Sequence, residues 1–246
     1  MPLRLARETL SALLDRMVPP RCGLCGQRTD TAGICSGCRD DLRWIVHACP
    51  RCASPLPDGL PEPTLCAACQ QRLPPFAEAG APLHYVFPID AVIKAFKFNG
   101  RIDLATMLGG LLLPWLADRH DQIDAIVPVP LHRWRQARRG YNQADELAAV
   151  LARGSGLPVE HRVRRRRATR SQSELSAAER RRNVRGAFRV DVRLDGRRVL
   201  VVDDVMTTGA TAAELASQLL RAGAASVSVL CVARASPPRS PTPVAP

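Results

Sequence analysis

The sequence predicts an α/β protein in which a parallel sheet flanked by helices follows a small cysteine-rich module. Strand-like and helix-like segments alternate after residue 73, a pattern typical of parallel sheets that are covered on both faces. Eight of the nine cysteines lie in the first 70 residues, and the Pro-rich break "RLPPF" separates them from the alternating part. With 246 residues, the chain is long enough for one mid-sized domain with an appendage or for two small domains.

These patterns divide the chain into four segments. We expect an amphipathic helix over residues 1–17, the cysteine-rich module over 18–72, the α/β domain over 73–234 and a disordered Pro/Ser-rich tail over 235–246. Charges interrupt the apolar residues of the first segment, which is not typical of a secretion signal. No apolar run reaches the roughly 20 residues that cross a bilayer. We therefore expect a cytoplasmic protein without a membrane span.

Every cysteine of the module belongs to a C-x-x-C pair. Two cysteines at this spacing can direct both thiolates at one metal, and two pairs complete a tetrahedral site, so the module predicts two structural Zn²⁺ ions. A reducing compartment disfavours a disulfide framework, and tandem pairs outside a βαβ unit disfavour redox catalysis. Sequential pairing is the simplest arrangement, and interleaved pairing stays open. The predicted ligands are Cys22, Cys25, Cys35, Cys38, Cys49, Cys52, Cys66 and Cys69.

The elements of the α/β domain follow from apolar periodicity and from Gly and Pro breaks. Helical spacing dominates the longest stretch and is interrupted near Asn99 and Gly100. Short apolar runs bounded by Pro, Gly or charged residues predict the strands. In chain order we expect a strand at 84–87, helical structure over 91–119, a strand at 123–130, a helix over 141–156, a strand at 197–204, a helix over 211–224 and a strand at 226–233.

The run "VLVVDDVMTTGAT", residues 199–211, carries the most specific chemistry. Ligands of parallel sheets bind beyond the carboxyl ends of the strands, and we expect Asp203 and Asp204 where such a strand leaves the core. Neighbouring carboxylates can accept hydrogen bonds from vicinal hydroxyls or help to hold a metal. Helix N-terminal amides, threonine hydroxyls and the close approach allowed by Gly209 can cradle a phosphate. Together these features indicate a sugar 5-phosphate site.

This run closely resembles the phosphoribosyl-pyrophosphate (PRPP) signature of type I phosphoribosyltransferases. Combined with residues 127–148, with the Arg-dense residues 164–188 and with the four C-x-x-C pairs, the chain resembles the ComF family of competence-protein-F-like (GntX) proteins. The resemblance implies a type I phosphoribosyltransferase-like sheet behind a double zinc ribbon, with PRPP and Mg²⁺ bound. It also implies a role in natural competence, with single-stranded DNA and a competence helicase as candidate partners. The alternative is an active phosphoribosyltransferase with an unidentified acceptor, and catalysis stays open.

The resemblance assigns roles to individual residues. The aspartates would bind ribose hydroxyls, the loop 207–211 would bind the 5-phosphate, and the loop from Pro128 to His132 would bind the pyrophosphate. Arginine suits this last loop because its planar fork grips phosphate oxygens, and a mobile loop would close over PRPP. The predicted PRPP-binding residues are Asp203, Asp204, Thr207, Thr208, Gly209, Ala210, Thr211, Val129, Pro130 and Leu131. The predicted catalytic residues are Asp203, Asp204, Arg133 and Arg167.

The net charge of +12 is unevenly distributed. Between residues 133 and 185, fifteen arginines stand against five acidic residues, which favours either an anionic partner or a solvated basic face. Aromatic residues are scarce there, so contact with a nucleic-acid backbone is supported and sequence-specific recognition is not. The predicted nucleic-acid-binding residues are Arg164, Arg165, Arg166, Arg167 and Arg170.

Overall fold

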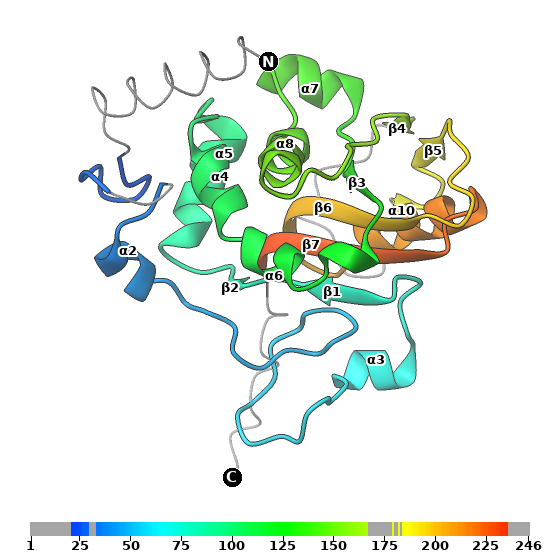
Figure 1. Cartoon of the computed structure of the whole chain (residues 1–246), viewed down its shortest axis with the longest axis horizontal. Helices are drawn as coiled ribbons and strands as arrows, with labels where there is room; N and C mark the ends of the chain where they lie inside the picture. The colour runs from blue at the N-terminus through cyan, green and yellow to red at the C-terminus, as the bar shows by residue number, and fades with distance from the viewer. Residues whose placement is uncertain (1–20, 30–32, 167–178, 180–181, 183, 236–246) are drawn as a thin grey trace.

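A central parallel sheet organises the molecule. The computed structural model describes residues 21–29, 33–166, 179, 182 and 184–235. Its strands lie in the order β1-β7-β6-β3, and β2 also pairs with β7; every pairing is parallel. Figure 1 shows the sheet crossing the middle of the molecule. The predicted parallel sheet is therefore confirmed. The strands are β1 (Glu78–Gly80), β2 (Leu83–His84), β3 (Ala125–Pro128), β6 (Arg198–Met206) and β7 (Ser226–Arg234).

Helices cover both faces of the sheet. Side chains alternate along a strand, so Leu200 and Val202 of β6 enter one apolar core while Val199 and Val201 enter the other. This burial on both faces explains why the apolar run has no polar interruption. One core is formed with α4 (Ile89–Phe98), α5 (Leu104–Gly110), α6 (Leu113–Ala117) and α8 (Gln143–Ser155), and the other with α10 (Ala210–Arg221).

The remaining elements are short. The predicted helical stretch 91–119 contains three helices, with a break at Gly100, whose φ of +68° favours glycine. The strand predicted at 84–87 is wrong beyond His84, because β2 pairs with β7 and β7 ends at Arg234, opposite His84. The small elements are α2 (Ser36–Asp40), α3 (Ala67–Gln71), the 3₁₀ turn η1 (His120–Gln122), α7 (Arg133–Arg139) and the antiparallel pair β4 (Val163–Arg165) and β5 (Phe188–Val190).

The cysteine-rich module packs into both cores. Cys22, Ile34 and Leu42 belong to the core that contains α5, whereas Ala53 joins the core that contains α10. The backbone at Gly33 lies so close to α5 that an added Cβ would be 2.7 Å from the Cβ of Met107. The module thus shares its apolar interior with the sheet. The predicted boundaries stay predictions, because residues 1–17 and nearly all of the tail lie outside the described residues.

Within the described part of the chain, no helix combines the length and the apolarity that crossing a membrane requires.

Candidate phosphate-binding site and metal clusters

The two aspartates lie within β6 and not beyond its end. Pairing with β7 continues to Met206 opposite Arg234, so the strand extends two residues past Asp204. The expectation that both carboxylates sit where the strand leaves the core is therefore wrong. Asp204 is buried, with 6% of its surface exposed, while Asp203 is partly exposed. Partners in the surrounding elements must compensate for this burial.

The buried negative charge of Asp204 is compensated mainly by Lys97, which lies at the end of α4. Its Nζ lies 2.9 Å from Oδ1 of Asp204. Burial lowers the pKa of Lys97, but the attraction and the hydrogen bond of Asp204 outweigh it, so the net shift is upward. The sequence prediction missed this residue. The one signal was its rarity, because Lys94 and Lys97 are the only lysines among 35 Lys and Arg residues.

For Asp203, the surroundings disfavour the charged form of the carboxyl. Burial, followed by repulsion from Asp204, raises the pKa of Asp203 to about 7. Lys97, the backbone N–H of Asp204 (2.9 Å to Oδ1 of Asp203) and Arg165 act in the opposite direction. Because burial and repulsion outweigh these three contacts, the pKa of Asp203 stays well above the usual range of a carboxyl.

Residues 207–209 connect β6 to α10, and Ala210 and Thr211 begin the helix, so loop 207–211 has the geometry of an anion cradle. Gly209 is the N-cap of α10 and has a φ of +72°, a conformation that side chains rarely tolerate. The Oγ1 of Thr208 accepts a hydrogen bond from the N–H of Ala210 at 3.3 Å. The twelve-residue helix that follows presents the positive end of its dipole to this loop. The loop can therefore hold a phosphate.

The second predicted loop lies at the same edge of the sheet. Residues 129–131 follow β3, which is the neighbour of β6, and the N–H of Val129 donates to the carbonyl of Val202 at 2.9 Å. Asn142 anchors this loop by donating to the carbonyl of Val129 (3.1 Å), while its Oδ1 caps α8 by accepting from Ala144 N (3.3 Å). The structure thus brings the two predicted PRPP-binding segments to one edge, although their roles stay predictions.

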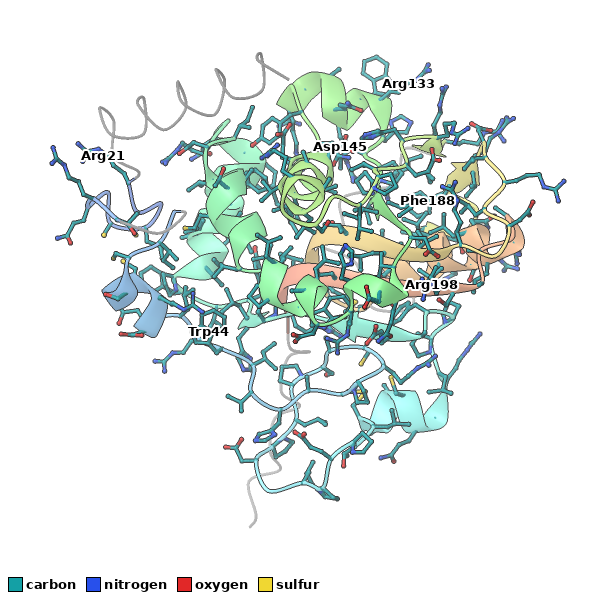
Figure 2. The ribbon with its side chains drawn as sticks, in the orientation of Figure 1. Arg21, Trp44, Arg133, Asp145, Phe188 and Arg198 are labelled. Atoms are coloured by element: carbon teal, nitrogen blue, oxygen red, sulfur yellow. The ribbon has the colours of Figure 1, made fainter. Side chains whose placement is uncertain are left out.

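Basic side chains lie around this edge. Arg139 packs 4.7 Å over the ring of Phe98 and donates to Gln143. Burial lowers the pKa of Arg139, and attraction to Asp204 counteracts this shift. Arg133 is exposed and projects from α7 at the outer edge of the molecule (Figure 2). It lines a cavity of about 380 Å³ together with Pro130, Leu131, Asp145, Arg164 and Arg165.

Of the predicted nucleic-acid-binding arginines, the three that the structure describes do not share one exposed face. Arg164 and Arg166 are exposed, but Arg165 is buried, with 8% exposure, and packs 5.5 Å over Phe188. Burial lowers the pKa of Arg165, and Asp203 opposes this shift, so this guanidinium lies within electrostatic range of the carboxylate pair. Arg167 and Arg170 lie outside the described residues.

The eight predicted ligands form two groups of four. In each group all Sγ atoms lie within 4.8 Å of one another, and the grouping is sequential: Cys22, Cys25, Cys35 and Cys38, then Cys49, Cys52, Cys66 and Cys69. Cys52 Sγ and Cys66 Sγ are 3.5 Å apart, far beyond a disulfide bond of about 2.05 Å. Zn–S bonds of about 2.3 Å place tetrahedral ligands about 3.8 Å apart, which matches this separation. Both groups are zinc-binding sites, and the interleaved alternative is excluded.

Comparisons with known proteins agree with this division. Residues 13–70 match the double zinc ribbon domain, and residues 115–242 match the phosphoribosyl transferase domain. DNA utilization protein YhgH of Salmonella typhi is 40% identical over 225 residues, spanning 88% of this chain and 98% of the relative. Competence protein F of Haemophilus influenzae is 36% identical, spanning 82% and 91%.

A solved structure of glutamine PRPP amidotransferase from B. subtilis, complexed with ADP and GMP, aligns with 22% identity and a TM-score of 0.40. The alignment spans 56% of this chain and 30% of that one. The full-length relatives, the two zinc clusters and the parallel sheet together identify the protein: the chain belongs to the ComF family, with a phosphoribosyltransferase-type domain behind a double zinc ribbon.

Proposed function

We propose that this protein binds PRPP together with Mg²⁺ at the carboxyl edge of the sheet and acts in the handling of incoming single-stranded DNA. One observation supports the PRPP proposal: two loops suited to phosphate follow the adjacent strands β3 and β6, and the carboxylate pair lies on β6 just before the second loop. PRPP carries its 5-phosphate and its pyrophosphate at different positions of the ribose, so a site with two separate phosphate-binding loops suits it.

The chemistry of each part supports this ligand. Asp203 and Asp204 offer carboxylate oxygens to ribose hydroxyls, because Lys97 engages Oδ1 of Asp204 and leaves the other oxygen for a ligand. The 5-phosphate would take the amides and hydroxyls of loop 207–211 at the start of α10. Loop 129–131 would hold pyrophosphate, with Arg133 and Arg139 adding positive charge.

The carboxylate pair also fits Mg²⁺. This ion prefers oxygen ligands, keeps several waters and binds through one or two carboxylates plus the phosphates of a substrate. Because Lys97 already neutralises part of Asp204, the site suits an ion held mainly by pyrophosphate. When bound, Mg²⁺ would neutralise charge that develops on the pyrophosphate.

The proposed role in competence is supported by the names of similar proteins and by the positive charge of exposed arginines. Two similar proteins carry the names DNA utilization protein YhgH and Competence protein F, and this chain is about as long as they are. Arg164 and Arg166 are exposed at the start of the Arg-dense residues 164–188 and offer cations to a phosphate backbone. Few exposed aromatics accompany them, which favours backbone contact over base recognition.

Calorimetric titration with PRPP and Mg²⁺ tests the PRPP proposal. We expect Asp203→Ala/Asp204→Ala to weaken binding at least about tenfold, since hydrogen bonds to charged groups contribute about 1.5–3 kcal/mol. Asp124→Asn is the matched control, because Asp124 pairs with Arg198 at the opposite end of β6 and lies away from both loops. Equal affinity of wild type and the double variant would overturn the assignment.

Salt-dependent binding to single-stranded DNA tests the second part. We expect Arg164→Glu/Arg166→Glu to weaken binding and to lower the slope of log K against log salt by about 0.7 per lost contact. The control is Arg193→Glu/Arg221→Glu, which changes the charge equally at exposed arginines near the amino end of the sheet. Binding that is absent, insensitive to salt or equally weakened in both variants would contradict a role for these arginines.

Turnover of PRPP is the second candidate function, and the loop at residues 129–131 favours it because a leaving pyrophosphate would need such a site. In the reaction, the bond between C1 of the ribose and pyrophosphate breaks, a bond from C1 to the acceptor forms, and the acceptor loses a proton. Incubation with PRPP, Mg²⁺ and a panel of nucleobases and amines should then release pyrophosphate. A protein that binds PRPP but releases none with any acceptor would contradict this candidate.

A further inference from the structure

A buried arginine connects the second zinc cluster to the loop that follows β6. Arg234 is the last residue of β7 and has 7% of its surface exposed. Its Nε donates to the carbonyl of Cys52 at 3.0 Å, and its Nη1 lies within hydrogen-bond range of the carbonyls of Met206 (3.0 Å), Thr207 and Ala235 (2.8 Å). One planar guanidinium therefore contacts both segments at once.

One of these segments contains a zinc ligand, and the other begins the proposed phosphate-binding loop. Cys52 is a ligand of the second cluster, and its Sγ lies 3.5 Å from that of Cys66. Thr207 opens the loop whose Gly209 begins α10. The bonds of Arg234 go to backbone carbonyls, so they fix where the main chain of each segment lies. A guanidinium suits this task because its donors form a rigid fork.

The turn around Cys52 has little freedom to move independently. Ala53 has a φ of +52° and is buried in the core that contains α10, and its N–H donates to the carbonyl of Cys49 at 2.8 Å. Zn²⁺ bound by four thiolates carries a net negative charge, which favours the buried cation next to it. Loss of the metal would free the side of this turn that the Cys52 thiolate holds, so the Cys52 carbonyl could shift, and it would remove the nearby negative charge. A buried donor that loses one of its acceptors is costly, so Arg234 would shift, and the carbonyls of Met206 and Thr207 that it holds would shift with it.

We propose that Arg234 is a positioning residue that couples zinc occupancy at Cys49, Cys52, Cys66 and Cys69 to PRPP binding at loop 207–211. The inference rests on the proposed binding of PRPP. Coupling between two sites is reciprocal, so PRPP should retain zinc in the second cluster as strongly as that zinc favours PRPP. The first cluster has no such contact with Arg234 among the described residues and serves as the internal reference.

Cysteine alkylation read by peptide mass spectrometry measures the coupling site by site. The protein is treated with N-ethylmaleimide in the presence of a mild zinc chelator, with and without PRPP and Mg²⁺. We expect PRPP to slow alkylation of the second cluster about fivefold or more, the lower end of typical coupling between sites. Alkylation of Cys22, Cys25, Cys35 and Cys38 should change little.

Two variants separate positioning from general stability. Arg234→Met should abolish the selective protection and weaken PRPP binding, and it should speed alkylation of the second cluster even without ligand. Arg198→Met is the control, because it removes an arginine that bonds Asp124 at the amino end of β6. Arg198→Met should keep both the protection and the affinity of wild type.

The outcomes distinguish this inference from the proposed function. Wild-type protein that binds no PRPP would overturn the proposed function and the coupling with it. Wild-type protein that binds PRPP but protects both clusters equally, or neither, would overturn the coupling alone. The comparison of the two clusters in the wild-type protein needs no variant, so it tests the coupling even if Arg234→Met does not fold. Retained selective protection in a folded Arg234→Met protein would show that another contact transmits the effect.

Discussion

Two like charges inside a buried strand are held by cations from elsewhere in the chain. Lys97 pairs with Asp204, while Arg139 and Arg165 lie within electrostatic range of the pair. These cations stabilise the negative charges only in part, because the pKa of Asp203 is still raised to about 7. In the free protein this carboxylate therefore lowers stability, as is common for binding residues. A ligand that donates hydrogen bonds or brings a cation would relieve this cost, so the pair favours ligand binding at the expense of stability.

We expect Asp203→Asn to raise the stability of the free protein in a pH-dependent way. The pKa of Asp203 rises from 3.8 to about 7 on folding, so the carboxyl disfavours the folded state increasingly as pH rises from about 4 to 7. An amide has no such effect and can still accept the bond from Asp204 N. The variant should gain about 1–2 kcal/mol over wild type above pH 7 and almost nothing near pH 4. Urea unfolding across this range measures it, and a gain independent of pH would contradict the raised pKa.

Local spacing reveals the residues that act within one segment and misses their distant partners. The aspartates and loop 207–211 form one run, so the sequence predicted them together. Lys97 and Arg234 reach this run from the end of α4 and the end of β7, and no periodicity connects them to it. Arg165 appeared as one of several arginines in a row, and its burial against Phe188 depends on the pairing of β4 with β5.

At the scale of elements, alternation predicted the sheet and its helices, and tertiary pairing set their limits. Apolar residues 199–202 mark β6, but its end at Met206 depends on β7 continuing beside it. The prediction ended the strand at Asp204 because charged residues normally leave a core. The turn after β6 is better determined by sequence, since Gly209 adopts a φ of +72° that selects glycine.

Gly209→Ala should weaken PRPP binding through the shape of the loop. An added Cβ would meet only Met206 Sδ at 3.6 Å, an ordinary contact, so the cost comes from the left-handed backbone and is about 1 kcal/mol. Gly156→Ala is a matched control, because Gly156 ends α8 with a φ of +77° and open space around it. Both variants should lose similar stability in thermal unfolding, and only Gly209→Ala should lose affinity in the PRPP titration. Equal loss of affinity in both would show that stability alone governs binding.

At the scale of the whole molecule, the zinc ribbon is part of the folded core. The sequence divides at the Pro-rich break near residue 73, yet the first half of the module packs with α5 and the second half with the core of α10. The sequence predicted the ligands because C-x-x-C spacing is local. It left the pairing open, because sequential and interleaved clusters differ only in how the turns meet in space.

This shared core predicts that loss of one zinc ion destabilises the entire protein. Cys25 is exposed, so Cys25→Ser removes a ligand of the first cluster without opening a cavity in the core. Zinc content should fall from two ions to one. Structural zinc contributes on the order of 10 kcal/mol in small zinc domains, and the part lost here should lower Tm by more than about 10 °C. Cys22 and Ile34 pack in the core that contains Met107, so the sheet and the ribbon should unfold in one transition.

The matched control for this prediction is Cys231→Ala, which alters a buried cysteine of β7 that belongs to neither cluster. It should retain both zinc ions and lose the packing of one sulfur and its contacts with the carbonyls of Gly80 and Ala233. Calorimetry combined with metal analysis compares the two variants. A Cys25→Ser protein that shows a separate low-temperature transition, with the main transition at the wild-type Tm, would mean that the ribbon folds independently. In that case the contacts of Gly33 with α5 would contribute little, whereas a single lowered transition would show that they join the ribbon and the sheet into one cooperative unit.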